Sequence, residues 1–218
     1  MSREKYIAWI RPAKGYLEAM KLCCQELLDP KRNRLENDPT APKGWEMGYY
    51  IENLISPIIY NIKHGIEVFL KGILFRFGTP NEKSHDLREL FASVKKIVLE
   101  TDWQPIDMES GQKVIDQAEI DRVKTEVLNK LEPLIEYFYN NRILSEKLGM
   151  KDLPDPKNEL FRYPNMRGDA PFDHIGFVNK LTEGDIKTIW EKIDEILRHL
   201  NDIGYLISVD ARYKPRKS

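Results

Sequence analysis

The segment from Ile51 to Phe77 constrains the fold more than any other part of the chain. Its apolar residues recur every three or four positions throughout, which is the spacing of one face of an α-helix. So wide an apolar face is typical of a central helix packed against several neighbours. Ser56-Pro57 allows two interpretations: the pair begins this helix as cap and first residue, or it kinks a longer one. The stripe comprises Ile51, Leu54, Ile55, Ile58, Ile59, Ile62, Ile66, Phe69, Leu70, Ile73, Leu74 and Phe77.

Four further stretches carry a helical pattern. The first runs from about Pro12 to Leu28, with Pro12 in its first turn. Another begins near Ser84, and a long one from about Gln112 to Gly149 should bend at Pro133. The last opens at Thr182, where a capping box is expected. No run alternates with a period of two, so the sequence predicts an all-α fold, an antiparallel bundle of about five helices.

The stretch from Lys151 to Leu181 lacks this periodicity. It contains four prolines and two glycines, and we expect a long irregular loop that covers one side of the bundle. Loops of this length in compact domains are uncommon and often functional. The basic segment 211–218 is expected to be a flexible tail. The length favours a single domain over residues 1–218.

Composition and charge narrow the class of protein. The 34 basic and 35 acidic residues nearly cancel, so a nucleic-acid site would have to be a local patch. The only cysteines, Cys23 and Cys24, are adjacent and predict neither a disulfide nor a thiolate zinc site. No histidine has a partner at a metal-binding spacing, and no nucleotide-binding loop motif is present, so we expect no metal and no cofactor. The absence of a signal-peptide pattern or an uncharged apolar span predicts a cytoplasmic protein without membrane association.

Two short patterns resemble those of the HEPN superfamily. The first is a Glu-x-x-x-Lys-x-x-Leu run, and the second is a His-x-Leu-x-x-Leu-Phe helix start after a short loop. An Arg-Tyr-Pro sequence within residues 159–164 also resembles a loop of larger family members. The resemblance implies a helical bundle, commonly dimeric, with roles in RNA or nucleotide association, and many members are RNases of toxin–antitoxin or phage-defence systems. The matching residues are Glu67, Lys71, Leu74, His85, Leu87, Leu90 and Phe91.

The family's RNase signature is an Arg followed, after four to six residues, by a His on a helix. This chain departs from that pattern, because no His follows Arg142 at that spacing in the fourth predicted helix. The one pair with the required spacing is Arg167 and His174, which lies in the Pro/Gly-rich loop. These two residues are therefore the candidate catalytic pair.

Glu67, Lys71 and His85 are candidate ligand-binding residues. On a helix, Glu67 and Lys71 lie one turn apart, so Lys71 could contact a phosphate that Glu67 helps to orient. The structural alternative is an intrahelical ion pair of a few tenths of a kcal/mol, or a bond from Lys71 to loop carbonyls. His85 could contact a ligand, or it could hold the Gly78–Ser84 loop on the bundle through a backbone carbonyl.

The loop adds Arg162 and Tyr163 to these candidates. An Arg can bind phosphate in a bidentate way, a Tyr can stack on a base and a His can transfer a proton at neutral pH. Together with Arg167 and His174, these residues could bind RNA, and without a metal they could supply part of the chemistry that cleaves it. The structural alternative is a folded loop with Tyr163 buried and its arginines paired to nearby acids.

Two functions from different classes follow. The first is association with RNA or a nucleotide, with a toxin or defence RNase as its sharper version. The alternative is a non-catalytic, dimeric interaction module of a toxin–antitoxin or defence complex. The expected partners are accordingly RNA or a nucleotide, a second copy of the chain, or an antitoxin-like protein.

Overall fold

The residues that the structure describes are helical apart from short connections. The part of the chain that the structure describes contains no strand, which confirms the predicted all-α class. A computed structural model describes residues 3–29, 47–79, 83–103, 115–149, 151–157, 177–178 and 180–208. The elements are α1 (Arg3–Leu28), α2 (Met47–Arg76), α3 (Leu87–Glu100), α4 (Gln117–Arg122), the π-helical segment η2 (Val123–Val127), α5 (Leu128–Tyr139), α6 (Arg142–Leu148) and α8 (Glu183–Ser208).

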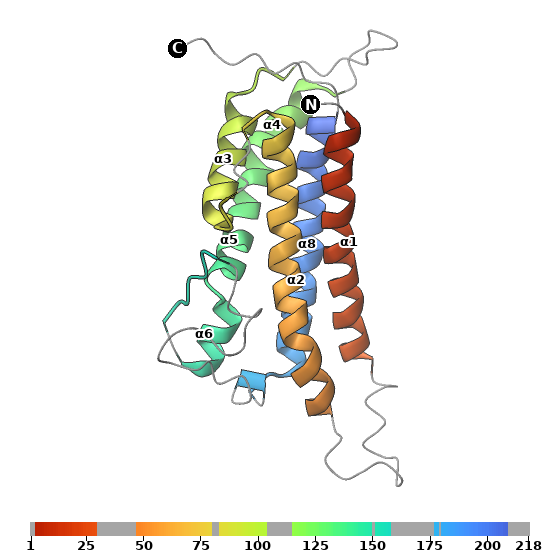
Figure 1. The fold of residues 1–218 in the computed structure, drawn as a ribbon, viewed down its shortest axis with the longest axis vertical. Helices are drawn as coiled ribbons and strands as arrows, with labels where there is room; N and C mark the ends of the chain where they lie inside the picture. Colours follow the sequence, from red (N-terminus) through yellow and green to blue (C-terminus); the bar gives the residue numbers. More distant parts are fainter. Residues whose placement is uncertain are drawn as a thin grey trace.

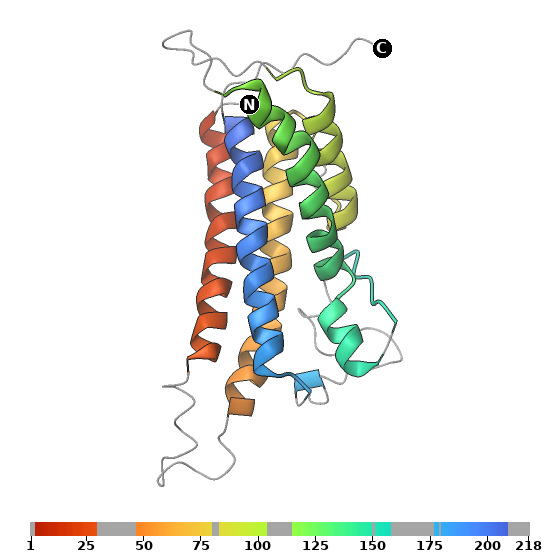
Figure 2. The same cartoon turned by 180° about the vertical axis from the view of Figure 1, so that it is seen from behind.

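The long helices form an elongated bundle with α2 at its centre (Figure 1). Helices α1 and α8 pack on one side of α2, and α3 with the α4–η2–α5 arm packs on the other, as the reverse view also shows (Figure 2). The pairs α1/α2, α1/α8, α3/α5 and α5/α8 are antiparallel, while α2, α3 and α8 run in the same direction. Short α6 lies below the end of α5.

Helix α2 is a central part of the core, as its sequence predicts, and it supplies nine of the described buried apolar residues, as many as α8. It packs against α1, α3, α5 and α8, so its apolar residues are buried around most of its circumference. It begins at Met47 and continues through Pro57, so of the two interpretations the longer helix is correct and the helix start at Ser56-Pro57 is wrong. Pro57 removes one backbone donor, but the core residues on both sides of it hold the helix together. The buried residues of α2 are Ile55, Ile58, Ile59, Ile62, Lys63, Ile66, Glu67, Phe69, Leu70, Ile73 and Leu74.

Helix α1 is longer than predicted. It begins at Arg3, nine residues before Pro12, so Pro12 lies inside the helix rather than in its first turn. A Cβ atom on Gly72 of α2 would lie 2.8 Å from the Cβ of Trp9 in α1. Because real side chains do not approach so closely, the lack of a side chain at this position permits the short distance between the two helices.

The single long helix predicted for Gln112 to Gly149 is interrupted. Its described part consists of α4, η2, α5 and α6, and α5 continues through Pro133. The chain leaves the α5 axis at Asn141, whose φ of 47° lies in the left-handed region. Asn adopts that region more readily than most other non-Gly residues, so Asn141 was a signal in the sequence for the end of this helix.

The helix starts depend on side-chain caps. Asp86 accepts hydrogen bonds from the backbone N–H groups of Arg88 and Glu89, so α3 begins at Leu87 rather than near Ser84. At α8, the backbone N–H of Thr182 donates to Asp185 Oδ2 at 2.7 Å, and the N–H of Asp185 donates in return to Thr182 Oγ1 at 3.4 Å. This reciprocal pair confirms the predicted capping box.

Only the ends of the predicted irregular loop, Lys151 to Leu181, are described. Residues 151–157 fold back on the end of α5, and residues 177–178 are helical with both side chains buried. The rest of the loop, and the predicted flexible tail at 211–218, lie outside the described residues.

Candidate functional site

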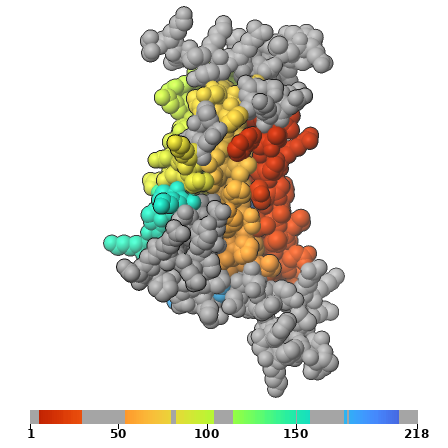
Figure 3. Space-filling view, viewed as in Figure 1, coloured from red at the N-terminus to blue at the C-terminus, as the bar shows by residue number. Residues whose placement is uncertain are grey.

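A row of charged side chains lies along one side of α2. Lys63, Glu67 and Lys71 are four residues apart, so they stand one turn above another. Lys63 and Glu67 are 0% and 4% exposed, and the Lys71 side chain is nearly buried. Figure 3 shows α2 flanked by α1 on one side and by α3 on the other. The row is thus covered by neighbouring elements and does not form an open helix face.

Glu67 links α2 to the start of α3. Its Oε1 atom lies 2.9 Å from Lys71 Nζ and 2.9 Å from His85 Nδ1. The ion pair predicted between Glu67 and Lys71 is therefore present. The His85 side chain is 51% exposed, and its Nδ1–H donates to a buried carboxylate, which fixes the ring orientation. Nε2 makes no hydrogen bond to any residue that the structure describes, so it is the nitrogen available to a ligand.

Lys63 forms the buried end of the row. Its ammonium group contacts Asp155 Oδ2 and lies 3.3 Å from Asn141 Oδ1. Burial lowers the pKa of Lys63, and the Asp155 carboxylate opposes that change. Asn141 Nδ2 also donates to the Leu153 carbonyl at 2.7 Å. These contacts attach the chain after α6 to α2, because a buried ammonium group needs both a counter-charge and hydrogen-bond acceptors.

The N-terminus of α3 holds a second group of polar side chains. Tyr139 donates from its hydroxyl to Asp86 Oδ2 at 3.2 Å, and burial raises the pKa of Tyr139, so the hydroxyl keeps its proton. The Arg88 guanidinium lies over the Tyr139 ring, 4.9 Å from its centroid, and its Nε is 2.8 Å from Glu136 Oε1. Arg88 is half exposed, so this guanidinium is held by a ring and a carboxylate and remains accessible near His85.

Fixed hydrogen-bond donors, and not an excess of positive charge, distinguish this region. Among the described side chains joined by the contacts above, the cations are Lys63, Lys71 and Arg88, and four carboxylates accompany them. An anion bound here would therefore depend on directed donors such as His85 Nε2 and the Arg88 guanidinium. The carboxylates belong to Glu67, Asp86, Glu136 and Asp155.

The chain matches no protein-family model, no curated protein and no solved structure. The HEPN resemblance thus stays a prediction that depends on the residues themselves. Among the described side chains, no three His, Cys, Asp or Glu residues are grouped so that they could hold a metal ion. Over the same residues, no helix is both long and apolar enough to cross a membrane. Burial raises the pKa of Cys24 to about 12, so its thiol stays protonated and is a poor nucleophile.

The structure brings together three of the predicted site residues. Glu67, Lys71 and His85 form one contiguous set. The expectation that His85 bonds a backbone carbonyl is wrong for Nδ1, whose partner is the Glu67 carboxylate, because α3 packs beside α2. The other predicted residues, namely Arg162, Tyr163, Arg167 and His174, lie outside the described residues.

Sequence reasoning left most residues of this region out of the candidate site. Lys63 was visible one turn before Glu67, but nothing in the sequence indicated that it is fully buried. Asp155 comes from the Pro-rich stretch, where no periodicity predicts a contact. Asp86 and Arg88 follow His85 directly, and an Asp before an apolar periodic run is a recognisable N-cap signal.

Proposed function

We propose that the chain associates with RNA or a nucleotide at the surface formed by His85 and Arg88. The observation that carries the proposal is the contact between Glu67 Oε1 and His85 Nδ1, 2.9 Å long, which directs a half-exposed imidazole away from a buried carboxylate. A phosphate oxygen would accept from His85 Nε2 and from the Arg88 guanidinium. Lys71 lies behind them and neutralises Glu67. The proposal is one of binding, and the sharper RNase version stays a prediction.

The charge distribution determines how such binding should respond to salt. Arg88 is the one fixed cation of the two proposed contacts, so the slope of log K against log salt should be roughly −0.7 for a single strand. A binder with a broad basic surface would show a steeper slope, because it releases more counterions. The near balance of acidic and basic residues in the chain supports the shallow slope.

The test is fluorescence anisotropy with a labelled single-stranded oligoribonucleotide and, separately, a fluorescent nucleotide. His85→Gln and Arg88→Gln should each weaken binding at least about tenfold, since a hydrogen bond to a charged group contributes roughly 1.5–3 kcal/mol. Arg198→Gln is the matched control, because Arg198 is also exposed and also pairs with a carboxylate, that of Asp194 on α8. Neither probe binding at all, or both variants binding like the wild type, would refute the proposal.

The same assay examines the residues predicted from the loop. Arg167→Ala and His174→Ala should reduce binding or cleavage if the predicted catalytic pair contacts RNA. If both variants behave like the wild type, Arg167 and His174 are not part of the site, and the surface formed by His85 and Arg88 remains the candidate. The non-catalytic interaction module, with a homodimer or an antitoxin-like partner, stays a prediction that light scattering can address.

A further inference from the structure

The side of α2 that lies between α1 and α3 reaches the surface of the bundle (Figure 3). Gly72 of α2 faces Trp9 of α1, and Glu67 faces His85 before α3, so α2 residues at intermediate angles point outward between the two helices. Between Pro57 and Arg76, the residues that are not buried make up this outward side, which we call the α2 strip. The strip consists of Pro57, Tyr60, Asn61, His64, Val68, Lys71, Phe75 and Arg76.

The α2 strip contains no carboxylate. Its basic side chains are those of His64, Arg76 and, at its edge, Lys71. The Glu67 carboxylate lies beside the strip, but it is buried and already contacts Lys71 and His85. The whole chain has 35 acidic residues, so a helix side without one is a marked local departure. Such a side favours an anionic occupant, because no like charge repels it.

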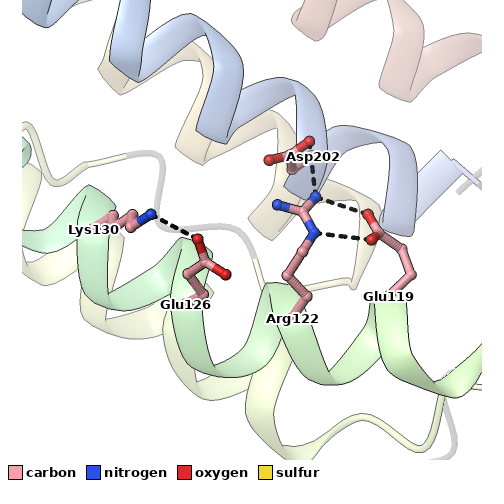
Figure 4. Close-up of polar contacts among 5 residues, drawn as sticks. All are labelled: Glu119, Arg122, Glu126, Lys130 and Asp202. Carbon is pink, nitrogen blue, oxygen red and sulfur yellow. Dashed lines mark hydrogen bonds and ion pairs between the residues drawn. The ribbon is translucent and has the colours of Figure 1, made fainter.

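The contact between α8 and the α4–η2–α5 arm has the opposite character. Figure 4 shows Arg122 between Glu119 and Asp202, at 2.8 and 3.2 Å. The same view shows Lys130 paired with Glu126 at 2.6 Å. Carboxylates and cations alternate on this surface and neutralise one another, so an anion gains little there. The lack of carboxylates is therefore a property of the α2 strip and not of the surface in general.

Aromatic rings gather at two positions along the α2 strip. At the first, Tyr16 of α1 meets the His64 ring edge-on, with centroids 5.0 Å apart, and Tyr60 stacks on His64 at 5.8 Å. At the second, Trp9 of α1 stacks on Phe75, also at 5.8 Å. Tyr16 is 37% exposed, and the other four rings are partly exposed. Accessible rings of this kind are the surfaces on which proteins stack unpaired nucleobases.

The distance between the two ring groups suits a strand rather than a single nucleotide. His64 and Phe75 are eleven residues apart on α2, which is about 16 Å along the helix. Stacked bases of one strand are about 3.4 Å apart, so this distance corresponds to about five nucleotides. Lys71 lies between the two groups. It also joins the strip to the proposed site, because Lys71 Nζ and His85 Nδ1 both lie 2.9 Å from Glu67 Oε1.

The composition of the strip argues against a protein partner. A helix that docks on a helical face uses apolar anchors three or four residues apart, and aliphatic side chains usually supply many of them. Val68 is the one branched aliphatic residue of the α2 strip. The apolar surface here comes mainly from rings, and rings without neighbouring carboxylates are suited to bases joined by phosphates.

We propose that the α2 strip and the α1 rings beside it bind a single strand of RNA several nucleotides long. Bases stack on the two ring groups, and the phosphate backbone between them passes Lys71. His85 and Arg88 hold a phosphate at the edge of the strip. This inference rests on the proposed function and specifies its ligand, which is a strand rather than a free nucleotide.

The test is fluorescence anisotropy of the full chain with three labelled probes: a mononucleotide, a hexaribonucleotide and an abasic hexamer with the same phosphates. The hexaribonucleotide should bind at least about fivefold more tightly than either other probe, since stacking of one base on a ring contributes about that factor or more. Tyr16→Leu and Tyr60→Leu should each weaken hexaribonucleotide binding at least about fivefold and change mononucleotide binding far less. Tyr205→Leu is the matched control, because Tyr205 is 51% exposed but belongs to α8.

The outcomes separate this inference from the proposed function. Equal binding of the hexaribonucleotide and its abasic form would refute the strip, and this comparison holds even if Tyr16→Leu fails to fold. A mononucleotide that binds through His85 and Arg88 as tightly as the hexaribonucleotide would refute the strip alone. Hexaribonucleotide binding that responds to Tyr16→Leu but to neither His85→Gln nor Arg88→Gln would support the strip and refute the proposed site.

Two further outcomes would also overturn the inference. If no probe binds, both the strip and the proposed function are refuted. If light scattering shows a dimer that Tyr16→Leu dissociates, a second copy of the chain occupies the strip instead of RNA.

Discussion

Replacing Lys63 by Met should destabilise the protein more than any substitution of a surface charge. Met keeps an unbranched apolar chain in the space of the lysine stem, so the change removes mainly the ammonium group. Asp155, whose side chain is 10% exposed, then keeps a carboxylate without its cation. Breaking a buried ion pair costs about 3–5 kcal/mol, and the slight exposure of Asp155 favours the lower end, about 3 kcal/mol. For a chain of this length, that loss lowers Tm by roughly 6–12 °C.

A double-mutant cycle separates the pair from simple packing. Asp155→Leu should cost a similar amount, because it leaves Lys63 buried without a counter-charge. The double variant should recover most of the loss, since an apolar pair satisfies the same space without either charge. The coupling free energy from urea unfolding should therefore be about 3 kcal/mol or more.

The control cycle uses Lys95→Met and Glu132→Leu. This pair also joins two helices, at 2.8 Å, but its side chains are 28% and 49% exposed. Water screens such a pair, so its coupling should stay below about 1 kcal/mol. A Lys63–Asp155 coupling as small as that of the control, or a Lys63→Met variant as stable as the wild type, would refute the reasoning that burial makes this contact important.

Three further predictions concern the packing, the acid response and the α3 cap. Gly72→Ala should lower the free energy of unfolding by about 1–3 kcal/mol, because its Cβ would lie 2.8 Å from the Cβ of Trp9. The control Gly184→Ala, whose Cβ would lie 3.6 Å from its nearest atom, should be neutral in urea unfolding. Equal losses in the two variants would contradict the close approach of α1 and α2 at Gly72. Burial lowers the pKa of His199 in the folded state, and the resulting contribution to stability is complete above pH 6.5 and is lost as the pH falls toward the folded-state pKa. His199→Gln should therefore flatten the decline of the urea midpoint between pH 7 and 5. An unchanged decline would mean that other groups cause it. Asp86→Ala should lower the free energy of unfolding, measured by thermal denaturation, by about 0.5–2 kcal/mol, and Asp86→Asn should lower it much less, since Asn also caps helices. Equal losses in the two variants would show that the cap is not the cause.

The helical elements could be predicted because their information is local. The three-four spacing of apolar residues in α2 and the Thr182–Asp185 capping box depend on residues within a few turns of one another. The errors occurred where tertiary packing outweighed a local signal. Pro12, expected in a first turn, lies inside α1 because the surrounding apolar residues are buried, and that burial offsets one missing backbone hydrogen bond. Pro57 lies inside α2 for the same reason, which was one of its two interpretations.

By itself, the sequence determined an all-helical chain with a central apolar helix, and it placed Glu67 and Lys71 on one side of that helix. Only the tertiary structure decided that Lys63 meets Asp155 across 92 positions of sequence, and that Glu67 meets His85. It alone showed that the buried His199 has no hydrogen-bond partner among the described residues. These contacts join segments whose separation along the chain carries no periodic signal, and the approach of such segments depends on how all the helices pack at once.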